Sequence, residues 1–493
     1  MRSPHTASIT FLSIGVLASA ELLPMLNKSL WLDEGASLYS AHLSWSALWH
    51  QSRVVDRVFL AYYAVLHLWV EISANIEWVR FLSVIAFGLT VVVIGHLGNR
   101  FGGFWCGVIA AVLTAANPLM IDAALDVRPY ALSALAATIA IYSLLRWRDS
   151  ADDRWFRRFC IASLVALVLH IFAILAPLAV LVIVFLVRPM TLRRSWRRVV
   201  VPLGMTLLLS LVYAFLVLGQ RGQIAWIPRM SVIRLLVDAY GPAGGYPRLG
   251  RISYAMIIVA LVGFGLVFIW LGRRRRSDSV DSSMRDNLVV ALAWAALPTL
   301  GLIAVSFVKP LYVDRYVTAS APGMALAVGL LLTQALKLND PKRPTRQRRV
   351  EGIAWRIIVV ALVANSIVIA SSTFENYAGV ARYLERQVGV NGEIALPDHS
   401  VGASVEYYLF NNRGSRRLWP ETPSQLHIMA LDLRENQVAI NSARPNVWVV
   451  EDETTGLGAF LDNLTRHGYV IIGTRQFVDL RTMTVAHYER SGR

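Results

Sequence analysis

A series of apolar runs along residues 1–373 constrains this chain more than any other feature. Each run has roughly 18 to 25 residues, the length at which a helix crosses a lipid bilayer. The runs cover residues 7–26, 78–97, 104–121, 128–147, 199–218, 252–272, 288–308, 316–336 and 356–373. Only 16% of the 493 residues are charged, while 56% are hydrophobic, which leaves too little charge for the surface of a water-soluble protein. The sequence therefore predicts a multi-pass α-helical membrane protein.

A tenth apolar run, residues 159–187, is too long for one ordinary crossing and short for two. Arginines cluster on both of its flanks, and basic loops stay on the cytoplasmic side of a membrane. We therefore predict two short helices that enter and leave on the same face and turn near His170. With each arm counted, the chain has about eleven spans, and its N-terminus is cytoplasmic.

The first run has an alternative interpretation as a signal peptide, because Ala18-Ser19-Ala20 resembles a small-residue cleavage site. Two observations favour a retained span. Arg2 is the only basic residue before the run, and cleavage would leave the polar segment after it without a membrane anchor.

The formal net charge of +16 first suggests a nucleic acid or an anionic membrane surface as a partner. The basic clusters at 273–276 and 337–349, however, fall in loops that the predicted topology places in the cytoplasm. Membrane sidedness accounts for them, so no nucleic-acid partner is expected. Cys106 and Cys160 are the only cysteines, and both lie in apolar runs, which excludes a disulfide framework and a cysteine-based zinc site.

After residue 373 the composition changes to 14 acidic and 12 basic residues, with short alternating apolar segments. This pattern predicts an external α/β domain over 374–493, following a membrane domain over 1–373 whose first external loop spans 27–77. We expect this domain to cap a site cavity or to contribute to the recognition of a substrate. Helices are predicted at 379–388 and 457–467, and strands at 393–397, 447–450 and 469–472.

Two adjacent carboxylates, Asp33 and Glu34, stand directly after the first span. One of them could act as a general base, which must lie within hydrogen-bond reach of the proton that it removes. They could also simply complement the dipole at a helix start. The same loop continues with Leu38–Trp49 and Leu60–Val70, which are rich in Trp, Tyr and Leu and are expected to be helices at the membrane interface.

Arginines open two of the predicted spans on the outer face, Arg128 after Asp126 and Arg315 before Tyr316. The planar guanidinium group suits recognition of phosphate or carboxylate, although Arg128 could instead pair with Asp122 or Asp126. Two arginines and a carboxylate pair at one rim describe a site for an anionic, lipid-linked substrate better than a transport path. A transporter would more typically place its charges near the bilayer midplane.

Five motifs, in order along nearly the whole chain, resemble the GT-C glycosyltransferase superfamily. The resemblance is to a family 39-like bacterial group related to protein mannosyltransferases and to the aminoarabinose transferase of lipid A. The motifs are Trp31-Leu32-Asp33-Glu34-Gly35, Tyr62-Tyr63-Ala64-Val65-Leu66-His67-Leu68-Trp69, Asn117-Pro118 with Asp126-Val127-Arg128-Pro129-Tyr130, His170-Ile171-Phe172-Ala173, and Pro310-Leu311-Tyr312-Val313-Asp314-Arg315-Tyr316.

Two departures from the family pattern concern the donor and metal region. The family has D-x-H-P-P where this chain has Asp56-Arg57-Val58-Phe59-Leu60, and Asp126 replaces a glutamate of the family. Both departures leave open the donor sugar and the need for a divalent cation such as Mg²⁺ or Mn²⁺. Between the two predicted interface helices, Asp56 and Arg57 could form an exposed ion pair or contribute to the site.

The resemblance implies a GT-C fold and an inverting hexosyl- or pentosyltransferase. Its donor would be a polyprenyl-phosphate sugar, and its acceptor a hydroxyl of a cell-envelope glycan, a lipid or a protein. The reaction would take place at the outer face of the cytoplasmic membrane, among membrane lipids. A lipid or sugar-lipid transporter without glycosyl transfer, and a non-catalytic membrane scaffold, are the alternatives.

The resemblance also implies roles for individual residues. Asp33 would be the general base, and Glu34 would position it or share a cation. Arg128 and Arg315 would bind the donor phosphate, assisted by Tyr130 and Tyr316. Further candidates for contact with substrate or metal are Asp126, Asp56 and His170, although for His170 a structural role is favoured over contact with the donor.

Overall fold

The computed structural model describes residues 4–187, 189–220, 282–336, 375–388, 392–397, 399–411, 427–431, 445–452, 458–478 and 482–491, with a few isolated positions between them. Its chain divides into two compact units. The first unit comprises Met1–Met25, His50–Tyr62 and Arg80–Ala370, and the second comprises Leu26–Trp49, Tyr63–Val79 and Ser371–Arg493. The spans predicted at 252–272 and 356–373 fall almost entirely outside the described residues.

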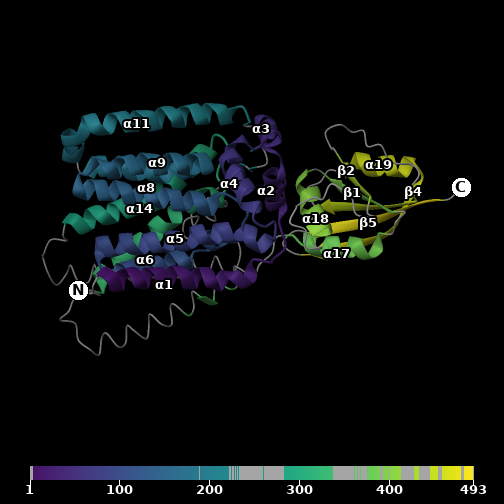
Figure 1. Ribbon diagram of the computed structural model, residues 1–493, viewed down its shortest axis with the longest axis horizontal. Helices are drawn as coiled ribbons and strands as arrows, with labels where there is room; N and C mark the ends of the chain where they lie inside the picture. Colours follow the sequence, from purple (N-terminus) through teal and green to yellow (C-terminus); the bar gives the residue numbers. More distant parts are fainter. Residues whose placement is uncertain are drawn as a thin grey trace. The chain divides into compact units, whose positions relative to one another are not determined.

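The first unit consists of long helices that lie side by side (Figure 1). They are α1 (Pro4–Leu22), α5 (Ile76–Gly102), α6 (Phe104–Ala115), α7 (Pro118–Ala124), α8 (Tyr130–Ser150), α9 (Asp153–Leu169), α10 (Leu175–Val187), α11 (Pro189–Leu218), α14 (Ser282–Ser306) and α15 (Ala321–Ala335). Short 3₁₀ helices connect some of them: η2 (Arg57–Phe59), η3 (Ile171–Ile174) and η6 (Asp314–Ser320).

Within the described ranges, six helices are long and apolar enough to cross a membrane. The pair α6 and α7 adds a seventh candidate if it is counted as one span bent by 60°. The bend lies between the end of α6 at Ala115 and the start of α7, which Asn117 caps: its side chain accepts hydrogen bonds from the N–H groups of Leu119 and Met120 at 2.9 and 3.3 Å. Pro118 occupies the first turn of α7, where its missing N–H costs nothing. The predicted run 104–121 is therefore a broken helix, and the total of about eleven spans stays a prediction.

The predicted break near His170 is confirmed. Helix α9 ends at Leu169, and His170 has an extended backbone with φ −155° and ψ 116°. The 3₁₀ helix η3 and then α10 follow, so the apolar run 159–187 is two helices joined at this residue.

One side of α11 carries large apolar side chains on its surface. Leu208, Leu211 and Phe215 are 61%, 68% and 76% exposed. Contiguous apolar surface of this kind is costly in water and suits contact with lipid. On its opposite side α11 packs against α9.

The first span packs closely into the bundle. A Cβ atom built on Gly15 of α1 would lie 2.8 Å from the carbonyl oxygen of Gly88 on α5, so both helices need small residues at this crossing. The Ser19 hydroxyl donates a hydrogen bond to the Val84 carbonyl at 3.4 Å one turn further along.

The second unit contains helices from the segment 27–77, namely α2 (Leu32–His42) and parts of α3 (Trp45–Val54) and α4 (Leu60–Val70), which also extend into the first unit. The helix predicted over Leu60–Val70 is confirmed as α4. The single helix predicted over Leu38–Trp49 is wrong, because Leu43 adopts an extended backbone (ψ 148°) that ends α2 before α3 begins. His67 of α4 contacts the Ala41 carbonyl at 2.7 Å and fastens α4 to α2.

The rest of the second unit is a five-stranded sheet with the order β2-β1-β3-β5-β4. Its strands are β1 (Gly392–Pro397), β2 (His427–Leu431), β3 (Asn446–Asp452), β4 (Tyr469–Val478) and β5 (Thr482–Arg490), and its helices are α17 (Tyr377–Gln387), α18 (His399–Asn411) and α19 (Gly458–Arg466). Strands β1, β2 and β3 are parallel, whereas β5 runs antiparallel to both β3 and β4. The three strands and two helices predicted for this region are confirmed, while β2, β5 and α18 were not predicted.

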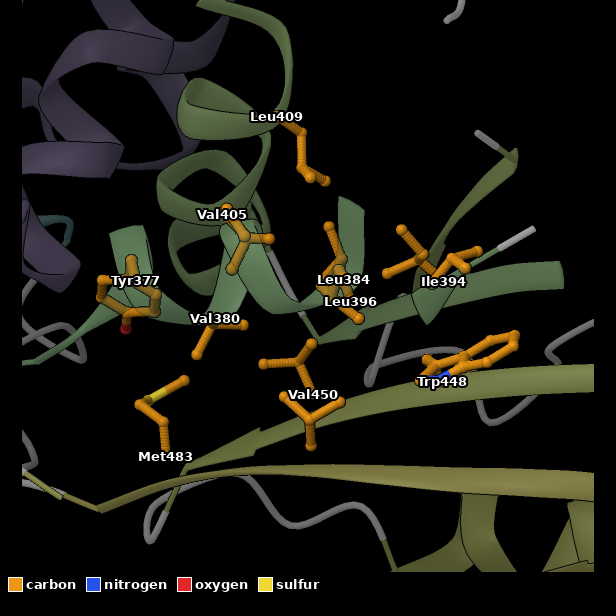
Figure 2. Close-up of a cluster of buried hydrophobic side chains, with 13 residues drawn as sticks. Tyr377, Val380, Leu384, Ile394, Leu396, Val405, Leu409, Trp448, Val450 and Met483 are labelled. Carbon is orange, nitrogen blue, oxygen red and sulfur yellow. The ribbon is translucent and has the colours of Figure 1, made fainter. Parts of the chain in front are cut away.

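Two apolar cores cover the two faces of this sheet. Figure 2 shows the larger core, in which Trp448 and Val450 of β3 meet Val380 and Leu384 of α17. The alternate residues of β3, such as Val449, face α19 on the other side. This two-residue alternation is the pattern of a strand buried on both faces. Each fully buried aliphatic side chain contributes about 1.5 to 3 kcal/mol relative to an exposed one.

The second unit joins part of the segment 27–77 to the C-terminal segment. Helix α18 packs against α2, and the Tyr407 hydroxyl of α18 donates a hydrogen bond to the Ala74 carbonyl at 3.1 Å. The division of the chain into a membrane domain over 1–373 and an external domain over 374–493 stays a prediction.

Candidate functional site

An aromatic cluster around His170 forms the centre of the candidate site in the first unit. The His170 ring is 3% exposed, and its centroid lies 5.2 Å from both the Tyr130 ring and the Tyr316 ring. Phe172 and Phe59 complete the surroundings, with ring centroids at 5.8 and 6.2 Å. Residues from four separate segments of the chain therefore meet at this one histidine.

The two arginines that open predicted spans both act on this cluster. The guanidinium carbon of Arg128 lies 4.1 Å from the centroid of the Phe59 ring, a cation–π contact, and Arg128 is only 5% exposed. Arg128 and Arg315 both interact electrostatically with His170. The structure thus brings together a buried cationic group and an aromatic wall.

The backbone around Arg128 is fixed by neighbouring helices. Arg128 lies in the turn between α7 and α8, and α8 begins two residues later at Tyr130. Asp126 belongs to the same turn, and its carbonyl accepts a hydrogen bond of 2.8 Å from the Ser83 hydroxyl of α5. Asp126 therefore has a backbone role in holding this turn.

A second turn carries Arg315 and Tyr316. The Ser306 hydroxyl at the end of α14 accepts hydrogen bonds from the N–H groups of Leu311 and Tyr312 at 3.2 and 2.8 Å. The Asp314 carboxylate accepts the N–H of Arg315 at 2.8 Å. The Tyr316 ring stacks on Phe172 at 5.1 Å, so the start of η6 is held against η3.

The segment that departs from the family's D-x-H-P-P pattern supplies Phe59. Asp56 has a left-handed backbone with φ 54° and starts η2. The guanidinium group of Arg57 donates to the carbonyls of Ser52 and Leu216 at 3.1 and 2.8 Å, so Arg57 ties η2 to α11. Phe59 then reaches His170 and Arg128.

Asp33 and Glu34 lie in the first turn of α2, in the second unit. Glu34 is fully buried, and its carboxylate accepts the N–H of Trp31 at 3.2 Å, which caps the start of the helix. Asp33 is half-buried. The prediction that the pair lies at a helix start is thus confirmed. Glu34, however, is buried within the protein and not solvated.

The predicted site residues therefore fall into two groups. In the first unit, Arg128, Tyr130, His170, Arg315 and Tyr316 share one cluster, with Asp126 in the same turn as Arg128 and Asp56 at the start of the segment that carries Phe59. The second group, Asp33 and Glu34, lies in the second unit, in the first turn of α2.

The described part of the chain contains no group of three or more His, Cys, Asp or Glu side chains arranged to hold a metal ion. The carboxylates considered for Mg²⁺ or Mn²⁺, Asp56 and Asp126, therefore do not form a recognisable cation site with their described neighbours. No step of the chemistry below passes through a metal.

Three residues of the site region were missed at the level of sequence. Phe172 belongs to one of the motifs, and Phe59 stands in the segment that departs from the family pattern, but neither residue is a predicted site residue. Arg80, on α5 one turn before Ser83, is 0% exposed. A charged residue inside a predicted span is the signal that could have identified Arg80, because such residues are rare and costly in a membrane.

No family model matches this sequence, and no curated protein matches it significantly. Solved structures do match. The chain is similar to ArnT from Cupriavidus metallidurans bound to undecaprenyl phosphate, with a TM-score of 0.55 and 13% identity over 98% of both chains. The apo state of the same protein gives a TM-score of 0.57 and 14% identity, again over 98% of both chains. The arabinosyltransferase EmbB from Mycobacterium smegmatis is a weaker match, with a TM-score of 0.41 over 67% of this chain and 30% of EmbB. The chain therefore has the fold of ArnT, which agrees with the fold that its motifs predicted.

Proposed function

We propose that this protein transfers a sugar from a polyprenyl-phosphate donor to a hydroxyl group of an envelope glycan, a lipid or a protein. The reaction takes place at the outer face of the cytoplasmic membrane, where the C-terminal domain also lies. The observation that carries the proposal is a pair of arginines beside His170, the buried Arg128 and the half-buried Arg315, in a chain that shares the fold of a protein bound to undecaprenyl phosphate.

The two arginines suit a phosphate that must leave with negative charge. As the bond between the anomeric carbon and the phosphate oxygen breaks, charge builds on the departing polyprenyl phosphate. Cations that are already in place and shielded from water stabilise such charge more strongly than exposed ones. Arg128 is held by its turn and by Phe59, so it needs little rearrangement during the reaction. Tyr130 and Tyr316 border the same cluster and provide hydroxyl groups for the phosphate or the sugar.

Asp33 is the proposed general base. The acceptor hydroxyl attacks the anomeric carbon on the face opposite the phosphate, its proton passes to the Asp33 carboxylate, and the phosphate leaves with the bonding electrons. A single displacement of this kind inverts the configuration at the anomeric carbon. Asp33 is half-buried, and the neighbouring Glu34 caps the start of α2. Glu34 therefore acts by holding the backbone next to Asp33.

The proposal is tested first by mass spectrometry of lipid that co-purifies with the full-length protein. A bound polyprenyl-phosphate sugar would identify the donor, and incubation with candidate acceptors should then produce a new glycosidic bond. A lipid transporter would instead move the lipid across liposome membranes without forming a bond, and that result would refute the enzyme.

Binding of undecaprenyl phosphate tests the arginines separately. Arg315→Ala should weaken binding at least tenfold, because a charge-assisted contact to phosphate contributes about 1.5 to 3 kcal/mol. Arg157→Ala, an exposed arginine on α9, is the matched control and should bind as the wild type does. Equal affinity in the two variants would contradict the phosphate assignment.

A further inference from the structure

Three hydrogen bonds from the C-terminal segment converge on residues 29–32, the stretch directly before the proposed base. The N–H of Leu30 donates to the Tyr408 hydroxyl at 2.8 Å, and the N–H of Leu32 donates to the Glu375 carboxylate at 2.8 Å. In the third, the Ser29 hydroxyl accepts the N–H of Ala378 at 3.3 Å. The partners stand more than 340 residues apart in the sequence, yet they lie within the same compact unit.

Glu375 is the charged member of this set, and it is 0% exposed. A buried carboxylate is costly unless it accepts hydrogen bonds. It finds one at Leu32, the first residue of α2, whose N–H has no partner inside the helix. A negative charge at this end of a helix is also favourable to the helix dipole. Glu375 and α2 therefore stabilise each other.

The residues on either side of Asp33 are both fixed. Leu32 is held through its N–H, and its side chain packs against the core that Figure 2 shows. Glu34 is buried and bonded to the N–H of Trp31. Asp33 lies between these two residues and is itself half-buried, so the direction of its side chain depends on where the C-terminal segment places Leu32.

We propose that Glu375 is a positioning residue for Asp33, and that the C-terminal domain sets the geometry of catalysis through it. The proposal rests on the proposed function, since Asp33 has to be the base for its position to control the rate. Glu375 does not touch the reacting atoms. It acts through the Leu32 N–H, and a displacement of about 1 Å at a catalytic group is enough to lower a rate roughly 100-fold.

The kinetic test compares substitutions in the full-length protein. Glu375→Ala should lower kcat by about 10- to 100-fold with little change in KM for the donor, because only the position of the base is altered. Glu375→Gln keeps an oxygen that accepts the Leu32 N–H and should recover most of the rate. Glu385→Ala, an exposed glutamate on α17, is the matched control and should keep the wild-type rate.

The double variant Asp33→Asn/Glu375→Ala separates positioning from general damage. If Glu375 acts through Asp33, its removal should have no further effect on the residual rate of Asp33→Asn. A full multiplicative loss in the double variant would overturn the positioning role. A change in donor KM with unchanged kcat in Glu375→Ala would overturn it as well.

Hydrogen exchange tests the contact independently of activity. Amides of residues 30–34 should exchange faster in Glu375→Ala than in the wild type and in Glu385→Ala. Unchanged exchange in Glu375→Ala refutes the inference even if the enzyme is active. If exchange rises as expected while the wild type transfers no sugar from any donor, the proposed function fails, and with it the catalytic role of Glu375, although the contact itself stands.

Discussion

Arg128 lies in a turn and its guanidinium group lies over an aromatic ring, whereas arginines such as Arg157 on α9 are exposed. A contact of 4.1 Å to the Phe59 centroid stabilises a desolvated cation by about 0.5 to 2 kcal/mol. The ring thus offsets part of the cost of keeping the charge out of water while leaving it available to an anion.

Substitution of Phe59 should therefore reduce donor binding without removing any charge. For Phe59→Leu we expect the affinity for undecaprenyl phosphate to fall about 2- to 30-fold, which corresponds to the loss of the cation–π contact. Phe215→Leu, at an exposed position of α11, is the control. Isothermal titration in detergent measures both, and unchanged affinity in Phe59→Leu would show that the ring has no role in binding.

The buried Arg80 side chain should stabilise the folded protein. It is fully buried on α5, one turn from the Ser83 hydroxyl that holds Asp126. Removing a buried side chain that makes polar contacts leaves its partners unsatisfied, which costs about 1 to 3 kcal/mol each. Arg80→Ala should lower the Tm of the purified protein by several degrees, and Arg157→Ala, exposed on α9, should leave it unchanged. Equal Tm values would argue against a structural role for Arg80.

Single residues were predictable from sequence where a motif carried them. Arg128, Tyr130, His170, Arg315 and Tyr316 were chosen from their motifs, and the structure gathers them in one cluster. Phe59 could not be chosen in this way, because it stands where the family has proline, and its contact with Arg128 depends on two distant segments. The roles of all these residues stay predictions.

Among the secondary-structure elements, the long apolar helices and the break at His170 followed from hydrophobicity and flanking charge. Helix α18 did not, because His399–Asn411 contains Gly402 and two valines, which are weak helix formers. Its buried Val405 and Leu409 join the core in Figure 2, so tertiary packing decides its conformation. The break between α2 and α3 was also missed, since no glycine or proline marks it.

The C-terminal sheet should lose stability at mildly acidic pH. His487 of β5 stacks on Trp448 with ring centroids 4.0 Å apart, and Asn446 Oδ1 lies 2.9 Å from its Nε2. Burial lowers the pKa of His487, while the charge of Glu489 opposes the shift. The unfolded chain therefore binds a proton more readily than the folded one, so the contribution of His487 is present above pH ~6.5 and is lost as the pH falls below it.

Hydrogen exchange in β3 and β5 measures this effect. Between pH 7.5 and 5.5, after correction for intrinsic rates, protection should fall in the wild type and fall less in His487→Phe, which keeps a ring but does not titrate. His467→Phe, on an exposed histidine after α19, should follow the wild type. A His487→Phe variant with the full wild-type pH dependence would exclude His487 as the cause.

For the whole molecule, the fold was predictable because five motifs occur in the right order along a chain of apolar spans, and the similarity to ArnT over 98% of both chains confirms it. The association of the segment 27–77 with the C-terminal segment was not predictable. It depends on contacts such as the bond from the Leu32 N–H to Glu375, between residues 343 positions apart. Local sequence patterns carry no information about partners at that separation.

The most direct test of the account is sugar transfer by Asp33→Asn in the purified full-length protein. With the polyprenyl-phosphate sugar identified from co-purified lipid, the wild type and Asp462→Asn, an exposed control on α19, should form product. Asp33→Asn should bind the donor with wild-type affinity but lose transfer by at least 100-fold, the contribution expected of a general base. Wild-type transfer rates in Asp33→Asn would contradict the central claim.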